Sequence, residues 1–346
     1  MYKHFIRPLL FLLPPERVHG LIVALIRVLF RVPGILTLVR YAYTYRNSQP
    51  VEILGLRFPS RIGLAAGFDK NALFYKEFRA FGFGHIEIGT VTPRPQPGNP
   101  KPRSFRLPAD EALINRMGFN NLGVDAAVER LKNRPADLII GGNIGKNTLT
   151  PNSRAVEDYE YCFEKLYDHV DYFVVNVSCP NISDLRELQD QDMLEIILHR
   201  LMQLRSLKTQ KKPVLLKISP DLNFRQIDET LAIVKKAGLD GIVAVNTTIS
   251  RENLITPAAQ VMEAGMGGMS GKPLTSRSTE VIRYIREKAG SSLPVIGVGG
   301  IMSETDAMEK FEAGADLLQV YIGFIYEGPG IVKRILRSLA KKESGK

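Results

Sequence analysis

Residues 172–181 read Tyr-Phe-Val-Val-Asn-Val-Ser-Cys-Pro-Asn. The apolar, β-branched first half of this stretch is typical of a buried strand, and Pro180 prevents the strand from continuing. Two amides, a hydroxyl and the Cys179 thiol come at the exit of the strand. Because buried polar groups need partners, either a ligand meets them there or the two Asn cap a turn beside an inert core thiol.

An apolar run with a polar exit occurs eight times along the chain. The runs are Ile62–Ala66, His85–Gly89, Leu138–Asn143, Tyr172–Val177, Val214–Ile218, Gly241–Val245, Pro294–Val298 and Leu317–Tyr321. Most of the intervals contain a stretch with helical periodicity, such as 227–237 and 279–288. Strands that alternate with helices predict right-handed βαβ units, and eight units are the number in a closed, parallel (β/α)8 TIM barrel. A doubly wound α/β sheet is the alternative, but no Gly-x-Gly-x-x-Gly fingerprint follows the first strand.

The composition is that of one large globular domain, with 346 residues of which 45% are hydrophobic and 24% charged. Its two cysteines, Cys162 and Cys179, provide neither a disulfide framework nor a metal cluster. The five histidines are scattered without ligand spacing, so we expect no metal site. The net charge of +10 is concentrated at the N-terminus, which argues for a local anionic partner and against nucleic acid.

Residues 1–46 combine this positive charge with an apolar, helical pattern. They contain seven Lys or Arg residues and one acidic residue, Glu16. Apolar residues repeat at alternate spacings of four and three, with small or basic residues on the opposite side. The apolar positions are Val18, Ile22, Leu25, Leu29 and Val32, and the opposite ones are Gly20, Ala24, Arg27 and Arg31. With a shorter helix at 6–13, the pattern predicts an amphipathic helical pair.

Two roles are open for this extension: it caps the protein's own core, or it rests on an anionic membrane surface. Arg27 and Arg31 interrupt the ~18 apolar residues that a membrane span needs, and no cleavage site of a signal peptide follows the first apolar core. Residues 47–50 mark a boundary, after which 51–58 predict a hairpin that turns at Leu54-Gly55. We therefore expect a helical extension over 1–46 and a barrel domain over 51–340.

Catalytic and binding residues of such barrels lie at the C-terminal ends of the strands. Each predicted end carries glycine, amide, hydroxyl or lysine groups. They are 66–70, Gly89-Thr90, Asn143, Asn176, Lys217, 246–248, Gly299-Gly300 and 321–323. Glycines after the seventh and eighth strands are typical of phosphate binding by backbone N–H groups. The pattern predicts a phosphorylated cofactor or substrate.

Lys217 lies at the end of the fifth run, where burial of an unpaired ammonium would be costly. A fixed lysine there would stabilise the negative charge that a flavin gains on reduction. The alternative is a lysine paired with a nearby carboxylate. Thr90, Asn143, Asn176 and the backbone of 66–69 offer hydrogen bonds to the other polar edges of an isoalloxazine ring.

Ten segments, in order from about residue 51 to the C-terminus, resemble one family. They are AAGFDKN, IEIGTVTPRPQPGNPKPR, INRMGFNN, NIGKN, NVSCPN, LKISPDL, VNTT, GGMSGKPL, GVGGI and QVYIGFIYEGP. These segments are similar to those of dihydroorotate dehydrogenase, and Pro15-Glu16-Arg17 with His19 resembles the extension of its membrane-associated, quinone-linked branch. The resemblance implies a barrel that holds FMN and oxidises dihydroorotate to orotate in pyrimidine synthesis.

The resemblance also implies roles for individual residues. FMN would be held by Ala66, Gly67, Phe68, Asp69, Lys70, Thr90, Asn143, Asn176, Lys217, Val245, Gly271, Gly300, Tyr321 and Ile322. Dihydroorotate would be held by Lys70, Asn115, Arg116, Met117, Gly118, Phe119, Asn176, Asn181, Asn246 and Thr247. Cys179 would remove a proton from ring carbon C5 while hydride passes from C6 to flavin N5. A cyclic diamide acid suits several Asn side chains and one Lys, because it presents imide groups and a carboxylate.

The sequence departs from the quinone-linked branch at the proposed base. That branch usually has Ser there, whereas Cys is typical of the soluble branch, so this chain combines the extension of one with the base of the other. Ile182 stands where the Ser-type enzymes generally have a Thr that helps to pass the proton outward. Val245 and Ile322 stand where related chains can carry hydroxyl residues, and backbone contacts can persist at both.

The resemblance favours a quinone-linked enzyme that is peripheral to the cytoplasmic face of the cell membrane. Its partners would be dihydroorotate and orotate, a membrane quinone, and an anionic membrane surface that residues 1–46 contact. The first alternative is a soluble-type oxidation with fumarate or partner-bound NAD as the acceptor. The second is a non-redox, phosphate-binding isomerase barrel.

Overall fold

The structure, a computed structural model, describes residues 2–177 and 191–345. Within them, eight parallel strands close into a barrel, which confirms the predicted TIM-barrel class. In barrel order the strands are β3 (Ile62–Leu64), β4 (His85–Val91), β7 (Ile139–Ile144), β8 (Tyr172–Asn176), β9 (Val214–Ile218), β10 (Gly241–Ala244), β12 (Val295–Val298) and β13 (Leu317–Val320). Each of the eight predicted runs corresponds to one of these strands, and β4 and β7 extend beyond their runs to Val91 and Ile144. Cys179, Asn181 and Ile182 lie outside the described residues.

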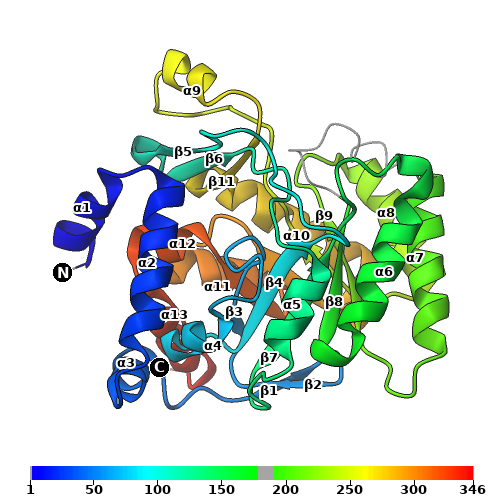
Figure 1. The fold of residues 1–346 in the computed structure, drawn as a ribbon, viewed down its shortest axis with the longest axis horizontal. Helices are drawn as coiled ribbons and strands as arrows, with labels where there is room; N and C mark the ends of the chain where they lie inside the picture. Colours follow the sequence, from blue (N-terminus) through cyan, green and yellow to red (C-terminus); the bar gives the residue numbers. More distant parts are fainter. Residues whose placement is uncertain (1, 178–190, 346) are drawn as a thin grey trace.

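Helices surround the barrel and connect successive strands (Figure 1). They are α4 (Tyr75–Phe78), α5 (Val124–Leu131), α6 (Ala155–Leu166), α7 (Gln191–Ser206), α8 (Phe224–Ala237), α10 (Thr275–Ala289) and α11 (Glu304–Glu312), with α12 (Ile322–Glu327) and α13 (Ile331–Glu343) after the last strand. The predicted helical stretches 227–237 and 279–288 lie within α8 and α10. Helix α8 begins at a capping box, in which Asn223 and Gln226 each accept a hydrogen bond from the other's backbone N–H at 2.9 Å.

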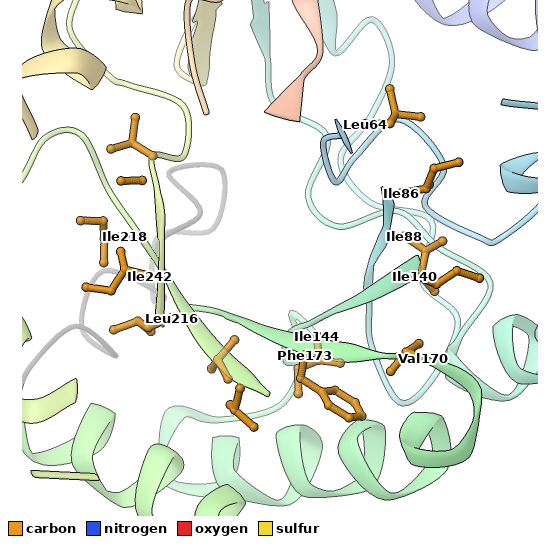
Figure 2. Close-up of a cluster of buried hydrophobic side chains, with 14 of the residues drawn as sticks. Leu64, Ile86, Ile88, Ile140, Ile144, Val170, Phe173, Leu216, Ile218 and Ile242 are labelled. Atoms are coloured by element: carbon orange, nitrogen blue, oxygen red, sulfur yellow. The ribbon is translucent and has the colours of Figure 1, made fainter. Parts of the chain in front are cut away.

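Alternation along the strands decides which side chains face the barrel interior. In β8, Phe173 and Val175 belong to the core between strands and helices, whereas Tyr172 and Val174 belong to the cluster inside the barrel. Figure 2 shows the outward set, with Phe173 directed toward the surrounding helices. The same alternation turns Asn176, the last residue of β8, toward the inside at the C-terminal end of the barrel.

A short hairpin, β1 (Val51–Ile53) and β2 (Leu56–Phe58), precedes the barrel as predicted. Leu54 and Gly55 both have positive φ angles, 58° and 69°, which are the angles of a type I′ turn. The hairpin places Phe58 against His85 of β4, with the ring centroids 5.2 Å apart. The N-terminal end of the barrel is therefore filled by side chains, and the opposite end carries the polar strand exits.

A separate antiparallel sheet that the sequence analysis did not predict lies beyond this polar end (Figure 1). Its strands, in the described chain, are β11 (Gly268–Gly271), β6 (Ala112–Asn115) and β5 (Ser104–Leu107), in that order. Helix α9 (Ala258–Ala264) packs on it through Ala264 and Val261. The sheet is built from two excursions of the chain, one after β4 and one after β10. Its strands have four residues each, too few to display a clear alternating pattern.

The N-terminal residues form a π-helical segment (Tyr2–Ile6) followed by α1 (Arg7–Phe11), α2 (Pro15–Leu29) and α3 (Ile35–Tyr43). The predicted pair is present as α1 and α2, but α1 is shorter than expected and α3 was not predicted. In the described part of the chain, no single helix has the length and hydropathy of a membrane span. Tyr2–Phe11 and Pro15–Leu29 meet that standard only as a pair bent by 118°.

The buried side of α2 differs from the predicted apolar side. Val23, Ile26 and Phe30 pack against the core of the barrel domain. Leu25 and Leu29, which belong to the predicted apolar side, are 49% and 41% exposed. Apolar residues thus occur on both the docked and the exposed side of α2, so spacing alone did not identify the side that packs on the barrel domain.

Candidate active site

A pocket lies at the C-terminal end of the barrel, between the strand exits and the β5–β6–β11 sheet. The residues that line it come from all parts of the barrel domain. They are Ala65, Ala66, Gly67, Lys70, Thr90, Ser104, Leu113, Asn115, Met117, Phe119, Asn176, Lys217, Val245, Asn246, Thr247, Ser270, Gly271, Leu274, Val298, Gly299, Gly300, Ile301, Gln319, Tyr321, Ile322 and Gly323. The pocket therefore combines apolar walls with a polar floor.

Most of the residues singled out in the sequence meet in this pocket. Of the predicted positions that the structure describes, five are not among the lining residues: Phe68, Asp69, Arg116, Gly118 and Asn143. Asp69 turns away to accept hydrogen bonds from the backbone N–H groups of Leu73 (2.8 Å) and Phe74 (2.9 Å). It therefore holds the loop that follows β3. Burial raises the pKa of its carboxyl to about 6.

The other outlying side chains also have local partners. Phe68 packs in an aromatic cluster, with its ring centroid 5.2 Å from those of Phe78 and Tyr321. The guanidinium of Arg116 donates to the carbonyl of Pro102 at 3.1 Å. Both residues shape the walls from behind, and Phe68 reaches the pocket through its contact with Tyr321.

A chain of hydrogen bonds links the amide side chains beneath the pocket, and each donor points the same way. Asn246 Nδ2 donates to Asn176 Oδ1 at 3.1 Å, and Asn176 Nδ2 donates to Thr90 Oγ1 at 2.9 Å. Thr90 Oγ1 donates to Asn143 Oδ1 at 2.5 Å. Asn143 Nδ2 donates in turn to Glu87 Oε1 at 2.7 Å. The series of hydrogen bonds therefore ends at Glu87, a residue that the sequence-based site did not include.

Glu87 is fully buried and accepts a second hydrogen bond at its other oxygen, from Gln319 Nε2 at 2.7 Å. Lys217 Nζ lies 4.0 Å from Glu87 Oε1, and the two side chains are 6% and 0% exposed. The carboxylate partner considered as an alternative for Lys217 is thus present. It does not remove Lys217 from the pocket, because Lys217 lines the pocket while pairing with Glu87 below it.

The aromatic and imidazole groups around the floor are uncharged. Burial raises the pKa of Tyr321 to about 12 and holds the pKa of the Tyr172 hydroxyl well above its ordinary value. Burial also lowers the pKa of His85 to about 3. Among the described residues of this layer, the charges that face the floor are therefore those of Glu87 and Lys217.

Two further features complete the pocket. Lys70 Nζ donates to Asn120 Oδ1 at 2.6 Å, which directs this lysine along the pocket wall. On the opposite side, Gly300 has a φ of +67°, and a Cβ atom there would lie 2.3 Å from Thr275 Oγ1. No side chain fits at this position, so the backbone itself forms the wall.

Helix α2 reaches the rear of the same pocket. His19 Nε2 lies 3.0 Å from the carbonyl oxygen of Phe68, and Glu16 pairs with Arg103 at 3.0 Å. The Arg103 side chain is 7% exposed and also donates to the carbonyls of Pro97 and Asn99. The N-terminal helices are thus joined to the loops that support the pocket.

Comparisons with known proteins identify the family to which this barrel belongs. The family model described as dihydroorotate dehydrogenase matches residues 49–342. The chain belongs to the dihydroorotate dehydrogenase family. Proteins of this family are flavin-dependent oxidoreductases of pyrimidine biosynthesis, so the matched span places such chemistry in the barrel.

Curated relatives cover the N-terminal helices as well. A protein of Christiangramia forsetii named dihydroorotate dehydrogenase (quinone) is 51% identical over 99% of both chains. One of Thiobacillus denitrificans with the same name is 46% identical, over 99% of this chain and all of that one. Among solved structures, the DHODH of Eimeria tenella in complex with ferulenol aligns with a TM-score of 0.83 and 32% identity, covering 96% of this chain and 92% of that one.

The pocket suits a flat, polar-edged ring system such as a flavin. Leu274, Val298 and Ile301 provide apolar surface, and the amide floor provides donors and acceptors. Gln319 Oε1 is buried and has no hydrogen-bond partner in the described structure, although Gln319 lines the pocket. A buried acceptor of this kind is normally satisfied, so a ligand that donates a hydrogen bond fits here.

Glu87 and Gln319 were missed because only the last residues of the strands were considered. Both lie two residues before a strand-exit residue, Gly89 and Tyr321. Since alternate residues face the same side of a strand, a polar residue at that spacing inside an apolar run predicts a second inward layer. The His85-Ile86-Glu87 pattern carries this signal. The sheet residues Ser104, Leu113 and Ser270 have no comparable signal.

Proposed function

We infer that this protein oxidises dihydroorotate to orotate with bound FMN and passes the electrons to a quinone. The observation that carries this function is the convergence of Lys217, the amide chain and a wall of glycine backbone in one pocket of a chain that belongs to the dihydroorotate dehydrogenase family. Relatives named dihydroorotate dehydrogenase (quinone) over the full length support the choice of acceptor.

FMN would supply the hydride acceptor in this pocket. Its phosphate would be bound by backbone N–H groups near Gly271, Gly300, Tyr321 and Ile322, where a side chain at Gly300 is excluded. Thr90, Asn176 and Lys217 would meet the polar edges of the ring from the floor, while Ala66, Gly67, Lys70 and Val245 border it. Asn143 would act from below, because its amide holds Thr90 and Asn176 in place.

The substrate would bind between the ring and the β5–β6–β11 sheet. Asn115 of β6, Met117 and Phe119 line the pocket there, and Asn246 and Thr247 line it from the end of β10. Lys70 offers its ammonium to the substrate carboxylate. Cys179 and Asn181 complete the proposed site from the segment after β8. Removal of the C5 proton by Cys179 and of hydride from C6 leaves the C5=C6 double bond of orotate.

We further propose that residues 1–46 rest on an anionic membrane surface and admit the quinone, whereas residues 51–340 form the catalytic domain. Large apolar side chains are exposed across the N-terminal helices: Leu9, Leu12 and Val28 are 68%, 79% and 60% exposed. Arg27 and Arg31 lie among them and would contact anionic headgroups. Attachment would be peripheral, on the cytoplasmic face of the cell membrane.

Comparison of electron acceptors tests this function. Purified protein is given dihydroorotate together with a short-chain quinone, fumarate or NAD, and orotate formation is measured with each. We expect turnover with quinone to exceed turnover with fumarate and NAD by at least tenfold. Fumarate as the best acceptor would instead support the soluble-type reaction, which the cysteine at position 179 favours. Protein that is purified without a flavin spectrum would refute both redox functions.

A further inference from the structure

The carboxylate of Glu87 accepts hydrogen bonds from two side-chain amides beneath the pocket. It is the acceptor at which the hydrogen-bond chain from Asn246 ends, and it also accepts from Gln319. A carboxylate can only accept hydrogen bonds, so its partners must donate. This requirement fixes which end of each amide donates and which accepts, from Asn143 through Asn176 to Asn246. The polarity that Asn176 and Asn246 present to a ligand therefore depends on Glu87.

Burial of this charge is costly, and packing does not require it. A neutral amide pair would fill the same space at a lower desolvation cost. Glu87 is 0% exposed, and its two oxygens accept hydrogen bonds from Asn143 and Gln319. The cost of burying this charge points to an effect of the charge itself on the pocket.

The charge lies beneath the floor of the pocket that would hold the flavin in the proposed reaction. Lys217 lies 4.0 Å away and lines the pocket, as does Gln319. A cation at the floor favours the negative charge that a flavin gains with a hydride, and a nearby anion opposes it. Neighbouring Tyr172, Tyr321 and His85 stay uncharged at neutral pH because burial shifts their pKa values away from it.

We propose that Glu87 is a positioning residue that acts as the counter-charge of the pocket floor. Through Lys217, Gln319 and the hydrogen-bonded amides, it lowers the reduction potential of the bound cofactor, so that the reduced cofactor still passes electrons to the acceptor. The inference rests on the proposed flavin site and adds to it a residue that sets the redox potential without touching the substrate.

The test is the two-electron reduction potential of the bound flavin in the native protein and in Glu87→Gln, measured by equilibration with a redox dye. Loss of the negative charge should increase the equilibrium constant for reduction at least tenfold, which is about 30 mV for a two-electron couple. Reoxidation by quinone should be slower in the same variant. Glu129→Gln is the matched control, because Glu129 is exposed on α5 and pairs only locally with Lys132; its potential should equal that of the native protein.

Two more variants separate charge from packing. Gln319→Glu alone places a second carboxyl where Gln319 Nε2 lies 2.7 Å from Glu87. Two buried carboxyls this close share one proton, so the net charge of the cluster and the potential should stay near their native values. The double variant Glu87→Gln/Gln319→Glu moves the carboxylate to the neighbouring side chain and should return the potential toward the native value. The double variant provides the test if Glu87→Gln alone fails to fold.

A potential that is unchanged or lower in flavin-loaded Glu87→Gln would overturn the proposal, as would a double variant whose potential stays raised. These outcomes differ from failure of the proposed function itself. Native protein that binds no flavin would refute the function. If the native protein binds flavin but Glu87→Gln has the same flavin potential, only the role of Glu87 is refuted.

Discussion

The floor of the barrel and the N-terminal helices are opposites in chemistry and in burial. The floor consists of polar side chains that are almost completely buried and hydrogen-bonded to one another, such as Asn143 and Glu87 at 0% exposure. The helices carry large apolar side chains that remain exposed, such as Leu12 at 79%. Each region therefore reverses the usual distribution of polar and apolar groups in a soluble protein.

This difference indicates two separate functions. Buried polar groups are retained where they hold or tune a ligand, and exposed apolar groups where another apolar phase covers them. In our account, the floor sets the reduction potential of the cofactor and the helices give the quinone access to it. The two regions meet at His19 and Phe68, and at Glu16 and Arg103. Changes at exposed positions of the helices, away from these contacts, should leave flavin reduction intact.

The largest effect should come from the proposed base. Cys179→Ala should slow flavin reduction by dihydroorotate by a factor of about 10² to 10⁴, the usual contribution of a positioned general base. Flavin content, orotate binding and reoxidation by quinone should be retained. Stopped-flow absorbance of the flavin measures both half-reactions. Cys162→Ala is the control, because Cys162 is buried in the core and belongs to α6. Near-native reduction in Cys179→Ala would show that the proton leaves by another route.

Replacement of the floor cation should have the next largest effect. Lys217→Met should slow flavin reduction about a hundredfold, because one fixed electrostatic donor is lost. It should also lower the flavin potential, which is opposite to the change expected for Glu87→Gln. The measurements are the stopped-flow reduction rate and the dye-equilibrated potential. A flavin-replete variant with native values for both would exclude Lys217 from the redox step.

The helices should show a smaller effect that depends on ionic strength. Arg27→Gln and Arg31→Gln should each weaken binding to anionic vesicles about fivefold at low salt, since one basic residue at such a surface contributes about 1 kcal/mol. The difference should shrink as salt is added. Vesicle co-sedimentation measures the binding. Arg225→Gln on α8 is the control, with a side chain that is 88% exposed. An equal loss of vesicle binding in the control would contradict a membrane-binding surface on the N-terminal helices.

The smallest effect on catalysis should come from His85, below the floor. Its pKa is lowered to about 3 by burial, whereas that of an unfolded chain is about 6.5. Between these values the unfolded state binds a proton that the folded state does not. The free energy of unfolding should therefore fall as the pH drops from 6.5 toward 3, by up to about 1.4 kcal/mol per pH unit from this residue.

Denaturant unfolding at pH 7 and pH 5 tests this contribution. His85→Leu should lose less stability between the two pH values than the native protein does. His199→Gln, at an exposed position of α7, should keep the native difference. If His85→Leu also keeps it, the acid sensitivity arises from other groups.

The barrel could be predicted from the sequence, because each strand is a short apolar run between polar segments. The strand exits also identified most of the pocket, since a parallel barrel brings its C-terminal ends together. Glu87 and Gln319 lay within reach of the same reasoning but needed the second inward position of the strands. The β5–β6–β11 sheet could not be predicted, because its strands are short and its β6–β11 pairing joins residues more than 150 positions apart, as with Asn115 and Gly268.

The docked face of α2 could not be predicted for a different reason. Apolar residues occur on both its buried side, at Val23 and Ile26, and its exposed side, at Leu25 and Val28. Periodicity identifies a single apolar side of a helix, and here there are two, of which one packs on the core. A core cap and the proposed membrane contact are therefore compatible, because α2 has a buried and an exposed apolar side.

The most direct test of the division between floor and helices is the measurement of both half-reactions in one variant. Leu12→Glu/Leu25→Glu places two charges on exposed positions of the N-terminal helices, away from the pocket, and Leu207→Glu is a control at another exposed leucine. Flavin reduction by dihydroorotate and reoxidation by a long-chain quinone in anionic vesicles are followed by stopped-flow absorbance. We predict a native reduction rate and a reoxidation rate lowered at least tenfold in the double variant, with both rates native in the control. Equal rates of reoxidation in all three proteins, or a parallel loss of both half-reactions in the double variant, would contradict the account.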